Sequence, residues 1–264
     1  MGTKILFVYL PYLTAAIFLG GIAYRLWKWS KTPVPLRIVL TPAPQTRSGV
    51  AWRLLGDVLW FPSLFKSDRL LWAGGWAFHI LLWLVLLRHL RYFFYPLPSW
   101  IVEIQTLGLY AGYFLPLPVF FLLIRRLTME RIIYISVLED LLALLLLLAV
   151  SVTGVLLTQF FRSDVVEIKA IILGLLHFRP IVPDVHWLFA LHFFLVMVLI
   201  GYFPLGKLLH AGGLFLSPTH NQRANFTERF VNPWDFPVAY NEHNLFPPEK
   251  YREMVSKSSQ GSPS

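Results

Sequence analysis

Residues 76–93 of the chain read WAFHILLWLVLLRHLRYF. Apart from two histidines, this stretch carries basic side chains only at Arg88 and Arg91, so it is apolar enough for a helix that crosses a membrane. His79 and His89 are ten residues apart, which separates them by roughly 15 Å along a helix axis. Because an imidazole in hydrocarbon is unfavourable without a partner, histidines at that depth usually have a function.

The composition of the whole chain agrees with a membrane protein. Of its 264 residues, 56% are hydrophobic and 14% are charged, and the mean hydropathy is +0.60, a balance typical of proteins that reside in a bilayer. Five stretches approach the roughly 20 apolar residues that a spanning helix needs: about 5–27, 70–93, 104–124, 137–160 and 185–206. We therefore expect an all-α integral membrane protein, with a five-helix transmembrane bundle at residues 1–215 and an extended cytoplasmic tail at residues 216–264.

Lysine and arginine are distributed unequally between the two sides of this bundle. Seventeen of the 23 fall in segments 25–69, 125–131 and 207–264, and six fall on the opposite side. Because cytoplasmic loops are the richer in these residues, we expect a multi-pass protein of the cell membrane with its N-terminus outside and its C-terminus in the cytoplasm. The formal net charge of +9 is then explained by the basic cytoplasmic segments, and no nucleic-acid partner is expected. The first apolar stretch lacks a basic start and a small-residue cleavage site, so it is interpreted as a retained helix.

Two shorter apolar segments are interpreted separately from the spans. Residues 52–65 and 165–178 place apolar side chains beside charged ones, which suits helices lying at the cytoplasmic and the outer interface respectively. The alternative for both is an apolar loop packed on the bundle. Past residue 216 the chain becomes polar, with aromatic residues spaced between prolines, and such a tail suits binding along a partner protein better than folding alone.

A second pair of histidines lies in residues 192–213, which read HFFLVMVLIGYFPLGKLLHAGG. With no cysteine in the chain, iron–sulfur clusters held by thiolates and covalent c-type haem are excluded, whereas two imidazoles can hold a b-type haem. Depth in the bilayer pairs His79 with His210 at an inner haem and His89 with His192 at an outer haem, stacked along the membrane normal.

The spacing of the second pair raises a question of length. Eighteen residues make five full turns, so His192 and His210 would project from one face of a continuous helix. That helix would span roughly 27 Å, against roughly 15 Å between His79 and His89. Gly201, Pro204 and Gly206 lie inside the interval, and a kink or tilt there would bring His210 to the depth of His79.

The surroundings of the four histidines are compatible with haem. Arg88 and Arg91 flank His89, where they either pair with haem propionates or reach lipid headgroups. His186 is interpreted either as a structural residue at the interface or as a proton-handling or competing group. Glycines in the expected spans would allow a flat ring to approach the backbone, or simply allow helices to pack closely: Gly74, Gly75, Gly112, Gly154 and Gly201.

With both histidine spacings and the five expected spans, residues 1–215 resemble the membrane cytochrome b (gamma) subunit of respiratory nitrate reductases. In the tail, GGLFLSPTHNQ, VNPWDFPV and PPEKYREM resemble DsrM, the membrane subunit of sulfite-reduction-associated DsrMKJOP complexes, which is related to the membrane subunit of heterodisulfide reductase. The resemblance implies two b haems, menaquinol chemistry near the outer haem, and electron exchange between the inner haem and a cytoplasmic iron–sulfur subunit of the DsrK or HdrD type. No clear equivalent of the site lysine of the nitrate reductase family is present.

These observations predict an electron-transfer subunit of a respiratory complex that oxidises quinol in dissimilatory sulfur metabolism. No Walker loop, Rossmann fingerprint, HExxH zinc pattern or nucleophile elbow occurs, so no soluble catalytic domain is expected. An isolated chain would complete only half of a redox reaction, and enzyme status is therefore a property of the complex. Within the superfamily, the alternative is a nitrate reductase gamma subunit. From other classes, the alternatives are a haem-free anchor with hydrogen-bonded histidines and a proton-coupled transporter, which Glu139 and Asp140 fit poorly because they lie at the end of their helix.

Overall fold

The computed structural model describes residues 2–32, 42–161, 164–217 and 219–224, and every regular element within those ranges is helical. Most of the predicted tail, including the VNPWDFPV and PPEKYREM motifs, lies outside the described residues. Four helical segments are long and apolar enough to cross a membrane: Gly2–Lys31, Arg69–Tyr92, Ser99–Thr128 and Leu138–Gln159. The prediction of an all-α membrane protein is confirmed at this level.

The four segments are built from helices that run on from one another. The first combines α1 (Gly2–Lys4), the π-helix η1 (Ile5–Tyr9) and α2 (Leu10–Lys31). The second combines α5 (Arg69–His89) with η2 (Leu90–Tyr92), and the third combines α6 (Ser99–Phe114) with α7 (Pro116–Thr128). After the short α8 (Glu130–Ile133), α9 (Leu138–Gln159) supplies the fourth. Their ranges agree with the hydropathy prediction because a span needs a fixed length of apolar chain.

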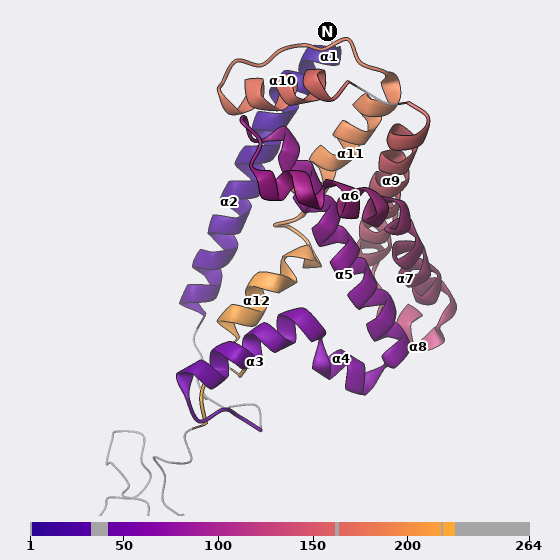
Figure 1. Ribbon diagram of the computed structural model, residues 1–264. Helices are drawn as coiled ribbons and strands as arrows, with labels where there is room; N and C mark the ends of the chain where they lie inside the picture. The colour runs from indigo at the N-terminus through magenta and orange to yellow at the C-terminus, as the bar shows by residue number, and fades with distance from the viewer. Residues whose placement is uncertain (1, 33–41, 162–163, 218, 225–264) are drawn as a thin grey trace, which may run out of the picture.

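Two sets of short helices lie across opposite ends of the long ones (Figure 1). At one end lies α10 (Val165–Leu176), and at the other lie α3 (Arg47–Trp60) and α4 (Pro62–Ser67). We refer to these as the α10 end and the α3 end. Both segments predicted as surface helices or loops are therefore helical, although the expected helix over 52–65 is divided at Phe61, whose φ of 48° is left-handed.

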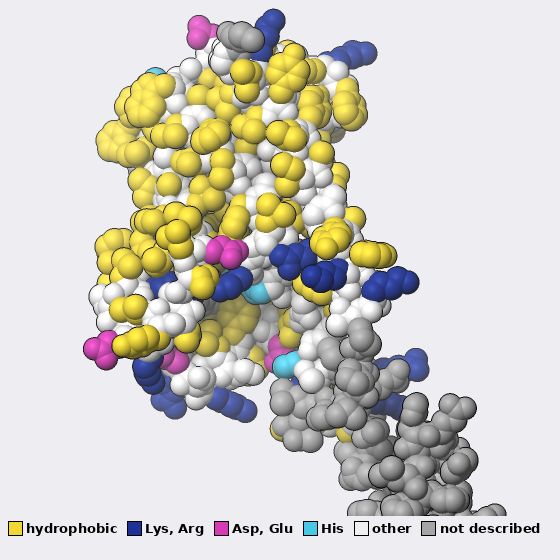
Figure 2. Space-filling view, turned by 180° about the vertical axis from the view of Figure 1, so that it is seen from behind, with side chains coloured by type: hydrophobic (Ala, Val, Ile, Leu, Met, Phe, Trp, Pro, Cys, Tyr) yellow, Lys and Arg dark blue, Asp and Glu magenta, His cyan; other side chains and the backbone are white. Residues whose placement is uncertain are grey.

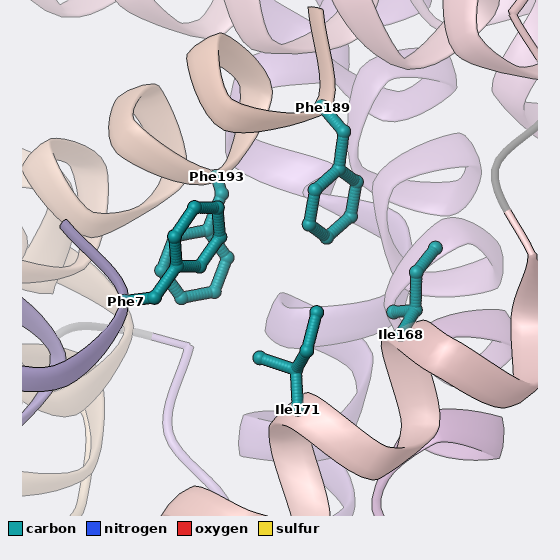
Figure 3. Packing of buried hydrophobic residues seen from close by; sticks show 5 residues of the cluster. All are labelled: Phe7, Ile168, Ile171, Phe189 and Phe193. Atoms are coloured by element: carbon teal, nitrogen blue, oxygen red, sulfur yellow. The ribbon is translucent and has the colours of Figure 1, made fainter. Parts of the chain in front are cut away.

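A cluster of buried hydrophobic residues lies at the α10 end (Figure 3). Ile168 and Ile171 of α10 pack against Phe7 of η1 and against Phe189 and Phe193 of α11 (Trp187–Tyr202). The rings of Phe7 and Phe193 stack with centroids 5.0 Å apart. Elsewhere, hydrophobic side chains cover most of the long helices on the face shown in Figure 2, as expected where lipid is the solvent.

The fifth predicted span differs from the structure. Helix α11 has 16 residues and ends at Tyr202, short of the expected boundary at 206. The chain then turns through Phe203–Gly206, forms the 3-10 helix η3 (Lys207–Leu209) and enters α12 (His210–Leu216). We call residues 203–209 the helix break. His192 and His210 therefore do not lie on one continuous helix. The chain leaves the helix within the interval where Gly201, Pro204 and Gly206 predicted a kink or tilt, because Pro204 lacks the backbone N–H that helix continuation needs.

Candidate haem-binding histidines

The helix break brings His210 next to His79 at the α3 end. The two imidazole rings, from α12 and α5, have centroids 5.9 Å apart and planes inclined at 87°. Phe61 and Phe78 each pack edge-on against the His79 ring with centroids 5.0 Å away, so the ring is held in one orientation. Two imidazoles bound to one metal through bonds of about 2 Å would have centroids roughly 6 Å apart. The observed separation fits a shared iron.

His89 and His192 form the second predicted pair, at the α10 end. Among the described residues they make no ring contact with each other, but they are near enough to interact electrostatically. The His192 ring lies against α9: a Cβ at Gly154 would be 3.3 Å from His192 Cε1. A side chain at position 154 would therefore crowd the imidazole, and this contact explains why a glycine stands there.

A hydrogen bond on Nδ1 sets the tautomer of each of the four rings. Backbone carbonyls accept from three of them, and each such imidazole must donate its Nδ1–H: His79 to Gly75 at 2.7 Å, His89 to Val85 at 2.7 Å and His210 to Lys207 at 3.2 Å. In every case Nε2 is left as the unprotonated nitrogen, the form that binds iron.

The fourth ring uses a side chain for the same purpose. His192 Nδ1 lies 2.8 Å from Thr153 Oγ1, and that hydroxyl donates to the carbonyl of Ala149 at 2.7 Å. Its lone pair therefore accepts from the imidazole. Exposed His177 makes the same kind of bond, to the carbonyl of Leu173. The Nδ1 hydrogen bond therefore sets the tautomer of an imidazole but does not by itself identify an iron ligand. The candidate ligands are identified by their pairing between helices.

The structure places both candidate propionate arginines on Gln105 of α6. Arg88 donates to the Gln105 carbonyl oxygen at 3.0 Å and Arg91 donates to its Oε1 at 3.2 Å. At the same contact, a Cβ on Gly108 would lie 2.6 Å from the Cβ of Arg88, so α5 and α6 approach closely here. Sequence reasoning missed Gln105 because no local pattern shows which helix a polar side chain faces. The contact of either arginine with haem propionates stays a prediction.

The contacts of His186 favour a structural role at the start of α11. Its Nδ1 accepts from the backbone N–H of Leu188 at 3.2 Å, which caps the first turn of α11. Its ring stacks on Phe161 with centroids 4.5 Å apart and an interplanar angle of 17°. These contacts fix the start of the helix that carries His192.

The donor set of the two pairs fits b-type haem better than a metal ion held by protein alone. In the part of the chain that the structure describes, no group of three or more His, Cys, Asp or Glu could hold a metal ion. A haem iron needs only two axial ligands from the protein, because the porphyrin supplies the other four. Pairs of neutral imidazoles from different helices are the ligands that such a cofactor requires.

Comparison with known proteins places these histidines in a family. The model of the nitrate reductase gamma subunit matches residues 61–221, a range that contains all four. Both curated relatives are named Hdr-like menaquinol oxidoreductase cytochrome b-like subunit: that of Archaeoglobus fulgidus is 32% identical over 86% of this chain and 82% of the relative. That of Archaeoglobus profundus is 31% identical over 87% and 82%. The resemblance to nitrate reductase gamma subunits is confirmed, and the narrower one to DsrM agrees with the Hdr-like relatives; the chain belongs to the nitrate reductase gamma subunit family.

Proposed function

We propose that this chain is the membrane cytochrome b subunit of a menaquinol oxidoreductase complex, with one b haem held by His79 and His210 and a second by His89 and His192. The observation that carries the proposal is the approach of the His79 and His210 rings to 5.9 Å from two different helices. A family whose relatives are named as cytochrome b-like subunits of menaquinol oxidoreductases supports it. When bound, each haem would take up and release one electron at a time.

The proposed orientation puts the α10 end outside and the α3 end in the cytoplasm, with α11 and the helix break completing a fifth crossing. The excess of Lys and Arg in segments 25–69, 125–131 and 207–264 supports it. Menaquinol is oxidised near the His89 and His192 pair, and electrons leave from the His79 and His210 pair to a cytoplasmic iron–sulfur subunit of the DsrK or HdrD type. Residues 216–264 bind along partner subunits of this DsrMKJOP-like complex.

The separation of His79 and His89 by ten positions along one helix gives a physical reason for two haem sites. Hydrocarbon is a poor medium for electrons. One site at the middle of α5 and one at its last residue divide one long transfer into shorter ones. The chain then completes half of a redox reaction, and its partner completes the other half. A nitrate reductase gamma subunit would use the same two pairs with a different partner, so the partner distinguishes the two functions.

A reduced-minus-oxidised spectrum with pyridine haemochrome quantitation tests the proposal. The purified chain should contain two b haems, and His79→Ala and His210→Ala should each remove the same one. His89→Ala and His192→Ala should each remove the other. His177→Ala is the matched control, since this exposed histidine has the same Nδ1 bond but belongs to neither proposed pair. Haem-free protein that keeps its partner subunits would instead establish an anchor.

A further inference from the structure

The helix break that delivers His210 lies beside a cavity and so is not held by packing alone. A cavity of about 370 Å³ is lined along the break by Leu205, Gly206, Lys207 and Leu209, with His210 in its wall. Figure 2 shows the surface hollowed at this end, close to Lys and Arg side chains. Non-helical backbone at such a depth also needs partners for its carbonyl groups. Other contacts must therefore fix the path of the chain.

Arg25 of α2 supplies one of these contacts. Its guanidinium donates to the carbonyl oxygen of Leu205, in the helix break, at 2.6 Å. One turn earlier in α2, a Cβ at Gly21 would be 2.7 Å from the Cβ of Pro204, so helix and break are in close contact. Pro204 is fully buried by this approach. Helix α2 thus supports the break from one side.

The first turn of α9 holds the break from the other side. Tyr202 donates its hydroxyl to Glu139 at 2.9 Å, and its ring folds over Gly206, where a Cβ would lie 2.5 Å from the hydroxyl oxygen. Lys207 pairs with Asp140 at 2.9 Å. The Asp140 side chain is 10% exposed and also pairs with Arg126 of α7 at 2.6 Å. Of the two cations paired with this largely buried carboxylate, Lys207 belongs to the helix break, so its ion pair ties the break to the first turn of α9.

The contact with Lys207 continues directly to the candidate iron ligand. The backbone carbonyl of Lys207 accepts from Nδ1 of His210 at 3.2 Å, and its Nζ is held by Asp140. One residue therefore joins the first turn of α9 to the imidazole. Such partners orient a metal-bound histidine and alter the properties of the metal.

We propose that Asp140, acting through Lys207, and Arg25, acting through Leu205, are positioning residues for His210 and so set the coordination geometry of the haem that His210 shares with His79. This inference rests on the proposed function. It assigns a role to two charged residues, on α9 and α2, that contact residues of the helix break. Movement of the break would tilt the His210 ring relative to the His79 ring.

Two variants that remove one cation each from Asp140 provide the test. In Lys207→Met the ion pair between Asp140 and the break is lost. In Arg126→Met a cation of the same charge is lost, but from α7 and not from the break. On the full chain, we expect Lys207→Met to shift the electron paramagnetic resonance signal and the midpoint potential of the His79/His210 haem. Arg126→Met should leave the signal in place, Lys207→Arg should restore it, and Arg25→Met should shift it as Lys207→Met does.

The second haem reports on folding in every variant, since His89 and His192 lie at the other end of the bundle. Equal shifts in Lys207→Met and Arg126→Met would show a charge effect and overturn the proposal, and so would no shift in either. Loss of haem in His210→Ala together with a wild-type signal in Lys207→Met would overturn only this inference. Retention of both haems in His210→Ala would instead remove the proposed function on which it rests.

Discussion

The two ends of the bundle hold their histidines by different physical means. At the α10 end, His192 lies within a continuous helix whose neighbours Phe189 and Phe193 belong to the aromatic core. At the α3 end, His210 follows a helix break beside a cavity and is connected to the bundle by ion pairs and hydrogen bonds. Apolar packing is dense and non-directional, whereas polar contacts depend on a few exact positions. The α3 end should therefore be the more sensitive to single substitutions.

The largest difference between the ends is expected from Gly21→Leu. A Cβ at this position would already lie 2.7 Å from the Cβ of buried Pro204, and a leucine would push α2 away from the helix break. We expect the haem of the His79/His210 pair to be lost while that of the His89/His192 pair remains, which haemochrome quantitation would measure as a fall from two haems to one. Gly20→Leu is the control, because a Cβ there meets nothing within 4 Å. Loss of both haems in Gly21→Leu would mean that the ends are not independent.

The second variant, Phe7→Ala, removes apolar packing at the α10 end. Phe7 has no exposed surface and stacks on Phe193, so Phe7→Ala should lower the free energy of unfolding by about 3–5 kcal/mol. Thermal denaturation in detergent would measure the loss, with Tyr9→Ala as control because Tyr9 is 66% exposed. Since packing loss is spread over many contacts, the signal of the His79/His210 haem should be unchanged below the unfolding temperature. A changed signal in the folded protein would contradict the separation of the two ends.

How far the sequence predicts each end follows from the same difference. Apolar length predicts the spans because a bilayer has a fixed thickness, and the ranges of α5 and α9 agree with it. Gly201, Pro204 and Gly206 marked the place of the helix break, but periodicity could not tell a kinked helix from one that stops. The partners of the break stayed hidden, because Lys207 and Asp140 are 67 residues apart and meet only in the folded chain.

The α10 end also contains a contact that no sequence pattern indicates. Thr153 was an unremarked residue of an apolar span, yet its hydroxyl accepts from Nδ1 of His192 at 2.8 Å. Helical phase relative to another helix decides such a contact, and a single sequence does not give that phase. Likewise, Arg88 and Arg91 were expected near haem propionates or lipid, and neither expectation included Gln105, the residue they contact.

Thr153→Val tests this contact with a smaller expected effect than the losses above. Valine keeps the shape of threonine but offers no acceptor, so the His192 ring would lose the partner that orients it. Loss of such a partner typically weakens metal binding about 10–100-fold. Titration of the haem-depleted chain with haem would measure the affinity of the His89/His192 site. Ser151→Ala is the control, because its hydroxyl bonds within α9 to Leu148; equal weakening in both variants would rule out a specific role for Thr153.

The smallest expected effect concerns Asp68, at the α3 end but away from the helix break. The backbone N–H of Leu71 lowers the pKa of this carboxyl below 3.8. Desolvation opposes this shift, and the charge and hydrogen bond of Arg125 add to it. Because the pKa is lower in the folded chain, the ionised carboxylate stabilises the fold above pH 3.8, and this contribution disappears as the pH falls through the folded-state pKa. The difference in unfolding temperature between the wild type and Asp68→Asn should thus be constant near neutral pH and vanish in acid. A difference that persists at low pH would show that Asp68 acts through packing, and sensitivity of the α3 end would then extend beyond its charged contacts.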